Sequence, residues 1–194
     1  MSDSQNRIKH WIFCISGFRQ HEGEMTGMQR LWLKLAPYRS SRRMVSLREW
    51  DADWGEVANL TALCSANGDT KVHIFGYSWG GGYGAIRLAE ELKYRGIKVQ
   101  GMVLSDPVWY GLGLIAKLIT WRTDWPKIIV PANVERVKTF FQRENRPRAH
   151  AVVAASPQET ELGLPVRRYR THEWMDDDNL FHQTCIDMIE ESLK

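Results

Sequence analysis

The chain has 194 residues and a mass of 22.5 kDa, a length that predicts one domain spanning residues 1–194. Hydrophobic residues make up 43% and charged residues 25% of the chain, which is ordinary usage for a globular protein and excludes wholesale disorder. The 26 Lys and Arg residues against 23 Asp and Glu residues leave a net charge of only +3. Because both signs are interspersed along the chain, nucleic acid is not expected as a partner.

The sequence also gives no sign of a membrane span, a disulfide framework or a zinc site. No stretch approaches the roughly 18 consecutive apolar residues of a membrane span, and the apolar run 11–15 is too short for the core of a secretory signal. The three cysteines, Cys14, Cys64 and Cys185, are an odd number without short metal-type spacing. We therefore expect a reduced, cytoplasmic protein that needs neither a metal nor a cofactor.

Short apolar runs rich in β-formers alternate along the chain with longer runs of helical periodicity. In chain order, these runs predict a strand at 8–16, a helix at 26–35, a strand at 43–50, a helix at 54–66, a strand at 71–75, a helix at 79–95, a strand at 98–105, a helix at 132–142, strands at 149–154 and 166–170, and a closing helix at 176–193. This alternation predicts an α/β fold, a mostly parallel sheet with helices on both faces. Such sheets bind ligands at the carboxyl ends of their strands.

The motif that carries chemistry directly follows the predicted strand 71–75. Gly76-Tyr77-Ser78-Trp79-Gly80 is a G-x-S-x-G sequence between a strand and a helix, which is the context of a nucleophile elbow. A Cβ at either outer glycine of so tight a turn would collide with the neighbouring strand or helix. The turn lifts the Ser78 hydroxyl above the sheet edge and directs the helix N-terminus towards the reacting centre.

Through this motif the chain resembles the α/β-hydrolase superfamily, in particular its small lipase-like and esterase-like members. The resemblance covers the motifs from residue 13 to residue 182 and implies a minimal form of that fold, in which residues 108–131 would supply a short lid. It also implies an oxyanion loop after the first strand, an acid after the elbow and a histidine near the C-terminus.

Two of the implied elements follow predicted strands. The first strand ends in Ser16-Gly17-Phe18, where the family usually has His-Gly, and the implied oxyanion donors are the backbone N–H groups of Phe18 and Trp79. The implied acid is Asp106 in Leu-Ser-Asp-Pro, because one helix and one strand separate it from the elbow and bring it to the same sheet edge. Many other hydrolases place the acid one strand later, where Glu159 and Glu161 are the alternatives.

Six histidines compete for the role of the base. Four are disfavoured because they lie inside predicted strands, precede the serine in the chain or begin a strand, namely His10, His73, His21 and His150. His172 follows the last predicted strand and precedes the closing helix, where the family has its catalytic histidine. His182 lies inside that helix, on an expected solvent or flank face, and is the reserve candidate.

The resemblance implies a serine esterase that cleaves a carboxylic ester or thioester through Ser78, His172 and Asp106, with an acyl-enzyme intermediate. The apolar segment after the acid begins with Trp109 and Tyr110, which would contact a small acyl or aromatic substrate. The alternative is a hydrolase-fold protein that binds a ligand or protein partner without turnover. It predicts Ser78 and His172 beyond hydrogen-bond reach. The oligomeric state is not indicated.

Three weaker patterns have simpler interpretations. Asp51 and Asp53 lack a third carboxylate or histidine, so a helix cap and a solvated neighbour are favoured over a metal site. The glycines at 80–85 match a dinucleotide pattern but lie within the helix, and no acidic residue follows at the required distance. The basic residues of 136–148 predict a solvated helix face.

Overall fold

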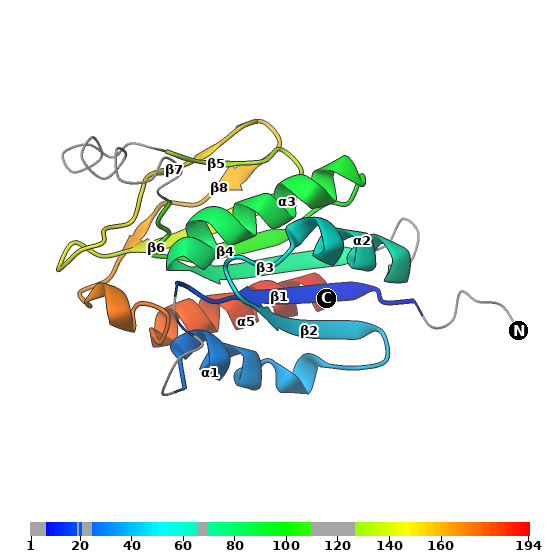
Figure 1. Ribbon diagram of the computed structural model, residues 1–194, viewed down its shortest axis with the longest axis horizontal. Coiled ribbons are helices and arrows are strands. Elements are labelled where there is room, and N and C mark those ends of the chain that lie inside the picture. The colour runs from blue at the N-terminus through cyan, green and yellow to red at the C-terminus, as the bar shows by residue number, and fades with distance from the viewer. Residues whose placement is uncertain (1–6, 19, 21–24, 66–69, 110–126) are drawn as a thin grey trace, which may run out of the picture.

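The structure is a computed structural model that describes residues 7–18, 20, 25–65, 70–109 and 127–194. Its centre is a parallel sheet in the order β2-β1-β3-β4-β6-β8, with β9 also paired to β6 (Figure 1). The strands of this sheet are β1 His10–Ile15, β2 Arg43–Arg48, β3 Lys71–Tyr77, β4 Gly101–Ser105, β6 Arg136–Phe141, β8 Glu161–Leu162 and β9 Val166–Arg167. A separate parallel pair consists of β5 Ile128–Val130 and β7 Val152–Ala154.

Strand register brings three chain segments to one edge of the sheet. Ile15 of β1 lies opposite Gly76 of β3, and Tyr77 of β3 lies opposite Ser105 of β4. Strands β1 and β4 are buried along their whole length, as expected for central strands of a parallel sheet covered on both faces. The residues that follow β1, β3 and β4 therefore emerge together at the carboxyl edge.

Within the described residues, helices cover both faces of the sheet (Figure 1). Helices α2 Trp54–Cys64 and α3 Ala85–Tyr94 pack on one face, against apolar side chains of β1, β3 and β4. Helices α1 Gly27–Lys34 and α5 Asn179–Leu193 pack on the other face, over a second core cluster. The parallel sheet and these two core clusters, one on each of its faces, give the predicted α/β architecture. Within the described residues, no helix combines the length and the apolar composition that crossing a membrane requires.

Helix starts agree with the capping residues in the sequence. The Thr26 side chain accepts the backbone N–H of Gln29, and the Gln29 side chain accepts the N–H of Thr26, which forms a complete capping box for α1. Asp53 caps α2 by accepting the Glu56 N–H, so the predicted helix-cap role of Asp53 is confirmed. Asp178 caps α5 in the same way.

The helix predicted at 132–142 is wrong. This segment contains the strand β6, whose side chains alternate between buried Val137 and Thr139 and the exposed Lys138. Valine, threonine and the Phe140-Phe141 pair favour an extended backbone, and β4 offers them an edge to pair with. The basic residues of 136–148 accordingly do not form a helix face.

Two smaller differences concern the boundaries of elements. Residues 128–130, inside the range assigned to a lid, form the strand β5, while residues 110–126 of that range lie outside the described residues. The helix predicted from residue 79 begins as a π-helical turn, Gly80–Gly84, before α3. The two-residue strand β8 was not predicted, because it is too short and exposed to give a periodic pattern.

Candidate active site

The turn after β3 holds Ser78 in a strained conformation. Its φ is +52°, a left-handed value that non-glycine residues adopt mainly where the surrounding structure enforces it. A Cβ at Gly76 would lie 2.8 Å from the carbonyl oxygen of Gly80, and a Cβ at Gly80 would collide with the carbonyl oxygens of Ile15 and Ser16. Both glycines are therefore required by close backbone approach, as the sequence motif predicts.

A continuous series of hydrogen bonds joins three side chains at this edge of the sheet. Ser78 Oγ lies 2.9 Å from His172 Nε2, and His172 Nδ1 lies 2.6 Å from Asp106 Oδ2. All three residues are buried, with Asp106 fully inaccessible. With the imidazole proton on Nδ1, His172 donates to the carboxylate and accepts the serine hydroxyl through Nε2.

Asp106 is held from several sides. Its φ is +43°, and its backbone N–H donates to the Phe140 carbonyl at 2.8 Å. Besides His172, the carboxylate accepts the backbone N–H of Gln142 at 3.1 Å, the Gln142 side-chain amide at 2.9 Å and the Ala149 N–H at 3.2 Å. Four donors thus satisfy the lone pairs of a carboxylate that is fully buried.

His172 is positioned through its backbone. Its N–H donates to Asn145 Oδ1 at 2.7 Å, and its carbonyl accepts the hydroxyl of Tyr77 at 2.8 Å. The Tyr77 ring also lies against the imidazole, with 5.1 Å between the ring centroids. Burial and the carboxylates of Asp176, Asp106 and Glu173 raise the pKa of Tyr77 far above its ordinary value, so the phenol keeps the proton that it donates.

The segment after β1 lies directly against the elbow. A Cβ at Gly17 would come within 3.0 Å of the Ser78 Cβ. The N–H of Ser16 donates to the Arg48 carbonyl at 2.9 Å, and the N–H of Gly17 donates to Gln20 Oε1 at 2.8 Å. Because both N–H groups donate within the protein, neither is available to an oxyanion. The next backbone N–H along the chain is that of Phe18, the expected oxyanion donor.

Gln20 connects this segment to the chain beyond His172. Its side-chain amide donates to Asp176 Oδ2 at 2.6 Å, and the same carboxyl oxygen accepts the N–H of Met28 at 3.2 Å. Burial raises the pKa of Asp176, against the opposing effect of these hydrogen bonds. The loop after β1 and the turn that carries His172 therefore share one buried carboxyl group.

Aromatic rings surround the residue that follows Ser78. Trp79 packs against Trp50 and Phe18, with ring centroids 4.8 and 5.4 Å apart, and Tyr83 contacts Trp50 at 6.2 Å. Phe18 is half exposed, at 51%. This aromatic cluster (Phe18, Trp50, Trp79 and Tyr83) was not predicted as a unit, because its members come from three separate segments.

The remaining candidate residues fall in different places. Trp109 is half buried and its N–H donates to His150 Nδ1 at 3.4 Å, whereas Tyr110 lies outside the described residues. The side chains of Glu159 and Glu161 are exposed, and Glu161 begins the strand β8. Neither Glu has a hydrogen bond to His172 among the contacts of the described residues.

The expected position of His182 is wrong. The residue is buried rather than on a solvent or flank face, at 1% exposure. Its Nε2 lies 2.7 Å from the Asp176 carbonyl oxygen, and its Nδ1 lies 2.9 Å from Lys34 Nζ. Because Lys34 donates to Nδ1, Nε2 carries the proton and donates to the carbonyl. Burial lowers the pKa of His182, and both ring nitrogens are occupied away from Ser78.

Sequence reasoning missed the residues that support the acid and the base. The sequence predicts Gln142 at the end of a helix, whereas it directly follows the strand β6, and Asn145 lies in the irregular segment beyond it. Of the supporting residues, only Tyr77 lies in a recognised sequence motif, where it occupies a variable position of the Gly-x-Ser-x-Gly elbow. Within the described residues, no group of three or more His, Cys, Asp or Glu side chains is placed to hold a metal ion.

The parallel sheet with β3 at its centre, the strained serine directly after β3 and the helices on both faces decide the fold. The fold is α/β-hydrolase-like. No protein-family model matches the chain, and no curated protein does.

Solved structures match most of the chain. RedJ with a PEG molecule bound in its active site shares 15% identity over 95% of this chain and 90% of that chain, with a TM-score of 0.46. The RedJ thioesterase of the prodiginine pathway in Streptomyces coelicolor shares 12% identity over 95% and 86%, with a TM-score of 0.47. A hyperthermophilic esterase from the archaeon Pyrobaculum calidifontis shares 13% over 97% and 79%, also with a TM-score of 0.47. Because these sequence identities are low, the reaction proposed below is argued from the residues of this chain alone.

Proposed function

We propose that the protein is a serine hydrolase that cleaves a carboxylic ester or thioester through an acyl-enzyme. The observation that carries this proposal is the series of contacts from Ser78 Oγ to His172 Nε2 at 2.9 Å and from His172 Nδ1 to Asp106 Oδ2 at 2.6 Å. A nucleophile, a base within hydrogen-bond reach and a third group that orients the base are the parts that nucleophilic acyl transfer needs.

In this proposal His172 takes the Ser78 proton through Nε2 as Oγ attacks the acyl carbonyl, and then returns it to the leaving alcohol or thiol. Asp106 fixes the Nδ1–H tautomer and stabilises the imidazolium that forms. Water then attacks the acyl-enzyme, with His172 again acting as the base, and releases the acid. The strained φ of Ser78 keeps Oγ in line with the base.

The oxyanion donors of this proposal are the backbone N–H groups of Phe18 and Trp79. Trp79 follows the nucleophile and precedes the π-helical turn Gly80–Gly84, so its peptide lies at a helical N-terminus, where partial positive charge favours an anion. Phe18 follows the two committed N–H groups of Ser16 and Gly17. Since only backbone donors are needed, Ser16 in place of the family's histidine does not remove a donor.

The substrate assignment is a small acyl ester with an apolar or aromatic part. The aromatic cluster next to Ser78 offers faces for such a group, and Trp109 and Tyr110 are proposed as further contacts. The alternative of binding without turnover predicts Ser78 and His172 beyond hydrogen-bond reach, and the observed 2.9 Å separation does not favour it.

The test is replacement of Ser78 by alanine. We expect Ser78→Ala to abolish hydrolysis of a short p-nitrophenyl ester while the thermal midpoint changes little, because only one buried hydroxyl is lost. Ser41→Ala, at an exposed position, is the matched control and should keep full activity. Undiminished hydrolysis by Ser78→Ala would show that the nucleophile lies elsewhere.

A further inference from the structure

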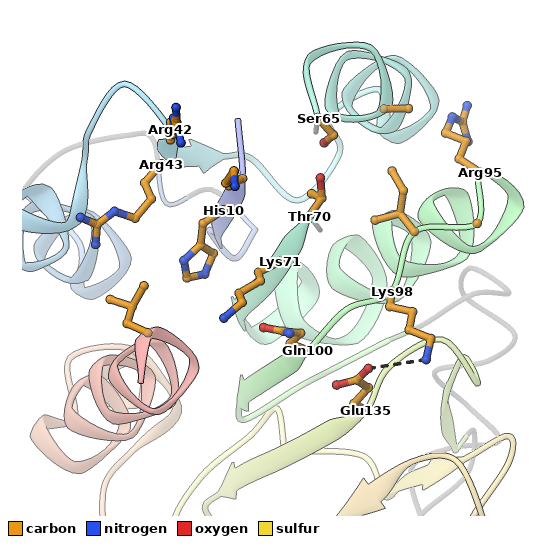
Figure 2. Close-up of a pocket in the computed structure, with 15 residues that line it drawn as sticks. His10, Arg42, Arg43, Ser65, Thr70, Lys71, Arg95, Lys98, Gln100 and Glu135 are labelled. Atoms are coloured by element: carbon orange, nitrogen blue, oxygen red, sulfur yellow. Dashed lines mark ion pairs between the residues drawn. The ribbon is translucent and has the colours of Figure 1, made fainter. Parts of the chain in front are cut away.

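A polar cavity lies at the opposite edge of the sheet from Ser78. It has a volume of about 940 Å³ and is lined at the amino ends of β1, β2, β3 and β4 and the C-terminal ends of α2, α3 and α5 (Figure 2). Strand β3 runs from Lys71 in the cavity wall to Tyr77 beside Ser78, so about 20 Å of extended chain separates the two places. The volume is that of a small-molecule site.

The cavity concentrates positive charge. Among the described residues, its lining contains one carboxylate, Glu135, against six basic side chains, namely Lys9, Arg42, Arg43, Lys71, Arg95 and Lys98. The whole chain has a net charge of only +3, so the remainder of the molecule is slightly negative. The three helix C-termini that face the cavity contribute roughly half a negative charge each, which offsets only about 1.5 of the five excess positive charges.

Arg42 lies across the cavity from Arg95 and Lys98 (Figure 2), and Lys71 donates to the Ser192 carbonyl. Arg95 pairs with Glu91 at 2.9 Å, and Lys98 lies 3.8 Å from Glu135, so these two cations are already compensated. On the other side, Lys9 and Arg42 have no ion pair with any described residue, whereas Arg43 Nε donates to Ser40 Oγ at 3.4 Å and its guanidinium points away from Arg42 (Figure 2). Lys9 and Arg42, here called the free basic group, are joined by the hydrogen bond from the Lys9 N–H to the Arg42 carbonyl at 2.8 Å and provide a place for one anionic group.

Two residues of the wall carry buried polar atoms that lack a partner. His10 Nδ1 and Gln100 Oε1 have no hydrogen bond to any described residue. His10 itself is 2% exposed, and its other nitrogen lies 2.7 Å from His73 Nδ1. A buried polar atom without a partner costs free energy until a bound group or an ordered water satisfies it. Ligand hydroxyl groups, which both donate and accept hydrogen bonds, meet this need.

We propose that this cavity binds a small phosphate monoester that carries hydroxyl groups, such as a sugar phosphate, at a site separate from Ser78. The phosphate contacts the free basic group, in which Arg42 offers forked donors and Lys9 an ammonium group to its oxygens. The hydroxyl groups lie towards His10 and Gln100. The described lining contains no tryptophan, tyrosine or phenylalanine, so it offers no stacking face for a nucleotide base.

The test is calorimetric titration of the full chain with glucose 6-phosphate. Separate titrations with glucose and with inorganic phosphate measure the binding of each part of that ligand alone. We expect one site per chain, an affinity for glucose 6-phosphate at least tenfold higher than for either part, and weaker binding as sodium chloride is added. No binding, several equivalent sites, or equal affinity for inorganic phosphate would overturn the proposal.

Two variants locate the site. Lys9→Glu/Arg42→Glu should weaken the binding of glucose 6-phosphate at least tenfold, whereas Lys93→Glu/Lys138→Glu, which reverses two exposed charges outside the cavity, should change it less than twofold. Gln100→Leu should weaken the binding of glucose 6-phosphate but not the binding of inorganic phosphate. Equal binding by the wild type and by Lys9→Glu/Arg42→Glu would refute the assignment. Binding needs no turnover, so this result stands apart from the proposed hydrolase activity.

Discussion

Asp106 is the residue whose role the structure makes most specific. It has a positive φ, is completely buried and receives His172 Nδ1 at 2.6 Å. If it orients the base, Asp106→Asn should lower kcat by up to about 10⁴-fold, because asparagine holds the wrong imidazole tautomer. KM should change much less, since the acid contacts the base and not the substrate. Steady-state kinetics on a p-nitrophenyl ester measure both constants.

The controls for this prediction are the two glutamates considered from the sequence. Glu159→Gln and Glu161→Gln should be nearly silent, because both side chains are exposed. An inactive Glu159→Gln beside an active Asp106→Asn would move the acid one strand later and leave Asp106 as a strained turn residue.

Gln142 is a positioning residue in this account. Its amide donates to Asp106 Oδ2 at 2.9 Å and to the Pro147 carbonyl at 2.8 Å, while its Oε1 accepts the N–H groups of Glu144 and Asn145. Gln142→Leu leaves these groups unsatisfied, so we expect a loss of about 1–3 kcal/mol in the free energy of unfolding.

The kinetic consequence separates positioning from simple support. Gln142→Leu should lower kcat with KM nearly unchanged, whereas the exposed control Gln183→Leu on α5 should alter neither the kinetics nor the urea midpoint. If Gln142→Leu lost the predicted stability while kcat stayed unchanged, Gln142 would have only a structural role.

At the scale of elements, the elbow depends on glycine. A Cβ at Gly80 would meet the backbone of Ser16, which cannot move without displacing β1, whereas a Cβ at Gly163 would lie 3.3 Å from its nearest neighbour, the Val137 carbonyl oxygen. Gly80→Ala should therefore cost about 3 kcal/mol or more, and Gly163→Ala less than about 1 kcal/mol. Thermal unfolding reports the difference, at roughly 2–4 °C per kcal/mol for a chain of this size. Equal midpoints would contradict the close packing of the elbow on β1.

The elements that sequence reasoning predicts are those with a strong local pattern. The buried runs of β1, β3 and β4 and the capped helices α1 and α2 are of this kind. The segment 132–142 is ambiguous locally, and pairing with β4, a contact distant in sequence, determines that it is a strand.

The residues of the candidate site also divide into those that a local sequence pattern indicates and those that it does not. Ser78, Asp106 and His172 each follow a predicted strand, so the order of motifs along the chain leads to them. The partners Gln142 and Asn145 lie in an irregular segment, where hydrogen bonds to Asp106 and His172 determine the conformation. No local pattern encodes such contacts.

At the scale of the whole molecule, two buried histidines make stability depend on pH. Burial first, and then Lys71 and Arg43, lower the pKa of His10 to about 4. Burial first, and then His10, Arg136 and Lys71, lower the pKa of His73 to about 3. Both residues are neutral when folded, and in the unfolded chain they take up protons below about pH 6.5. The stability that they contribute above this pH is therefore lost as the pH falls from about 6.5 towards 4.

This prediction is checked by urea unfolding at pH 7.5, 6.5 and 5.0. The midpoint of the wild type should fall more steeply with decreasing pH than that of His10→Phe/His73→Leu, in which neither residue titrates. His182, whose pKa is also lowered by burial, is present in both proteins and contributes equally. Parallel slopes would contradict the assignment of neutral histidines.

The central claim, that Ser78 is an activated nucleophile, is tested most directly by a fluorophosphonate probe and mass spectrometry of the digested protein. The contacts of Ser78 with His172 and of His172 with Asp106 predict one adduct per chain, located on the peptide that carries Ser78. The adduct should be absent in Ser78→Ala and form much more slowly in Asp106→Asn. Absence of labelling in the wild type, or an adduct on another residue that persists in Ser78→Ala, would contradict the account.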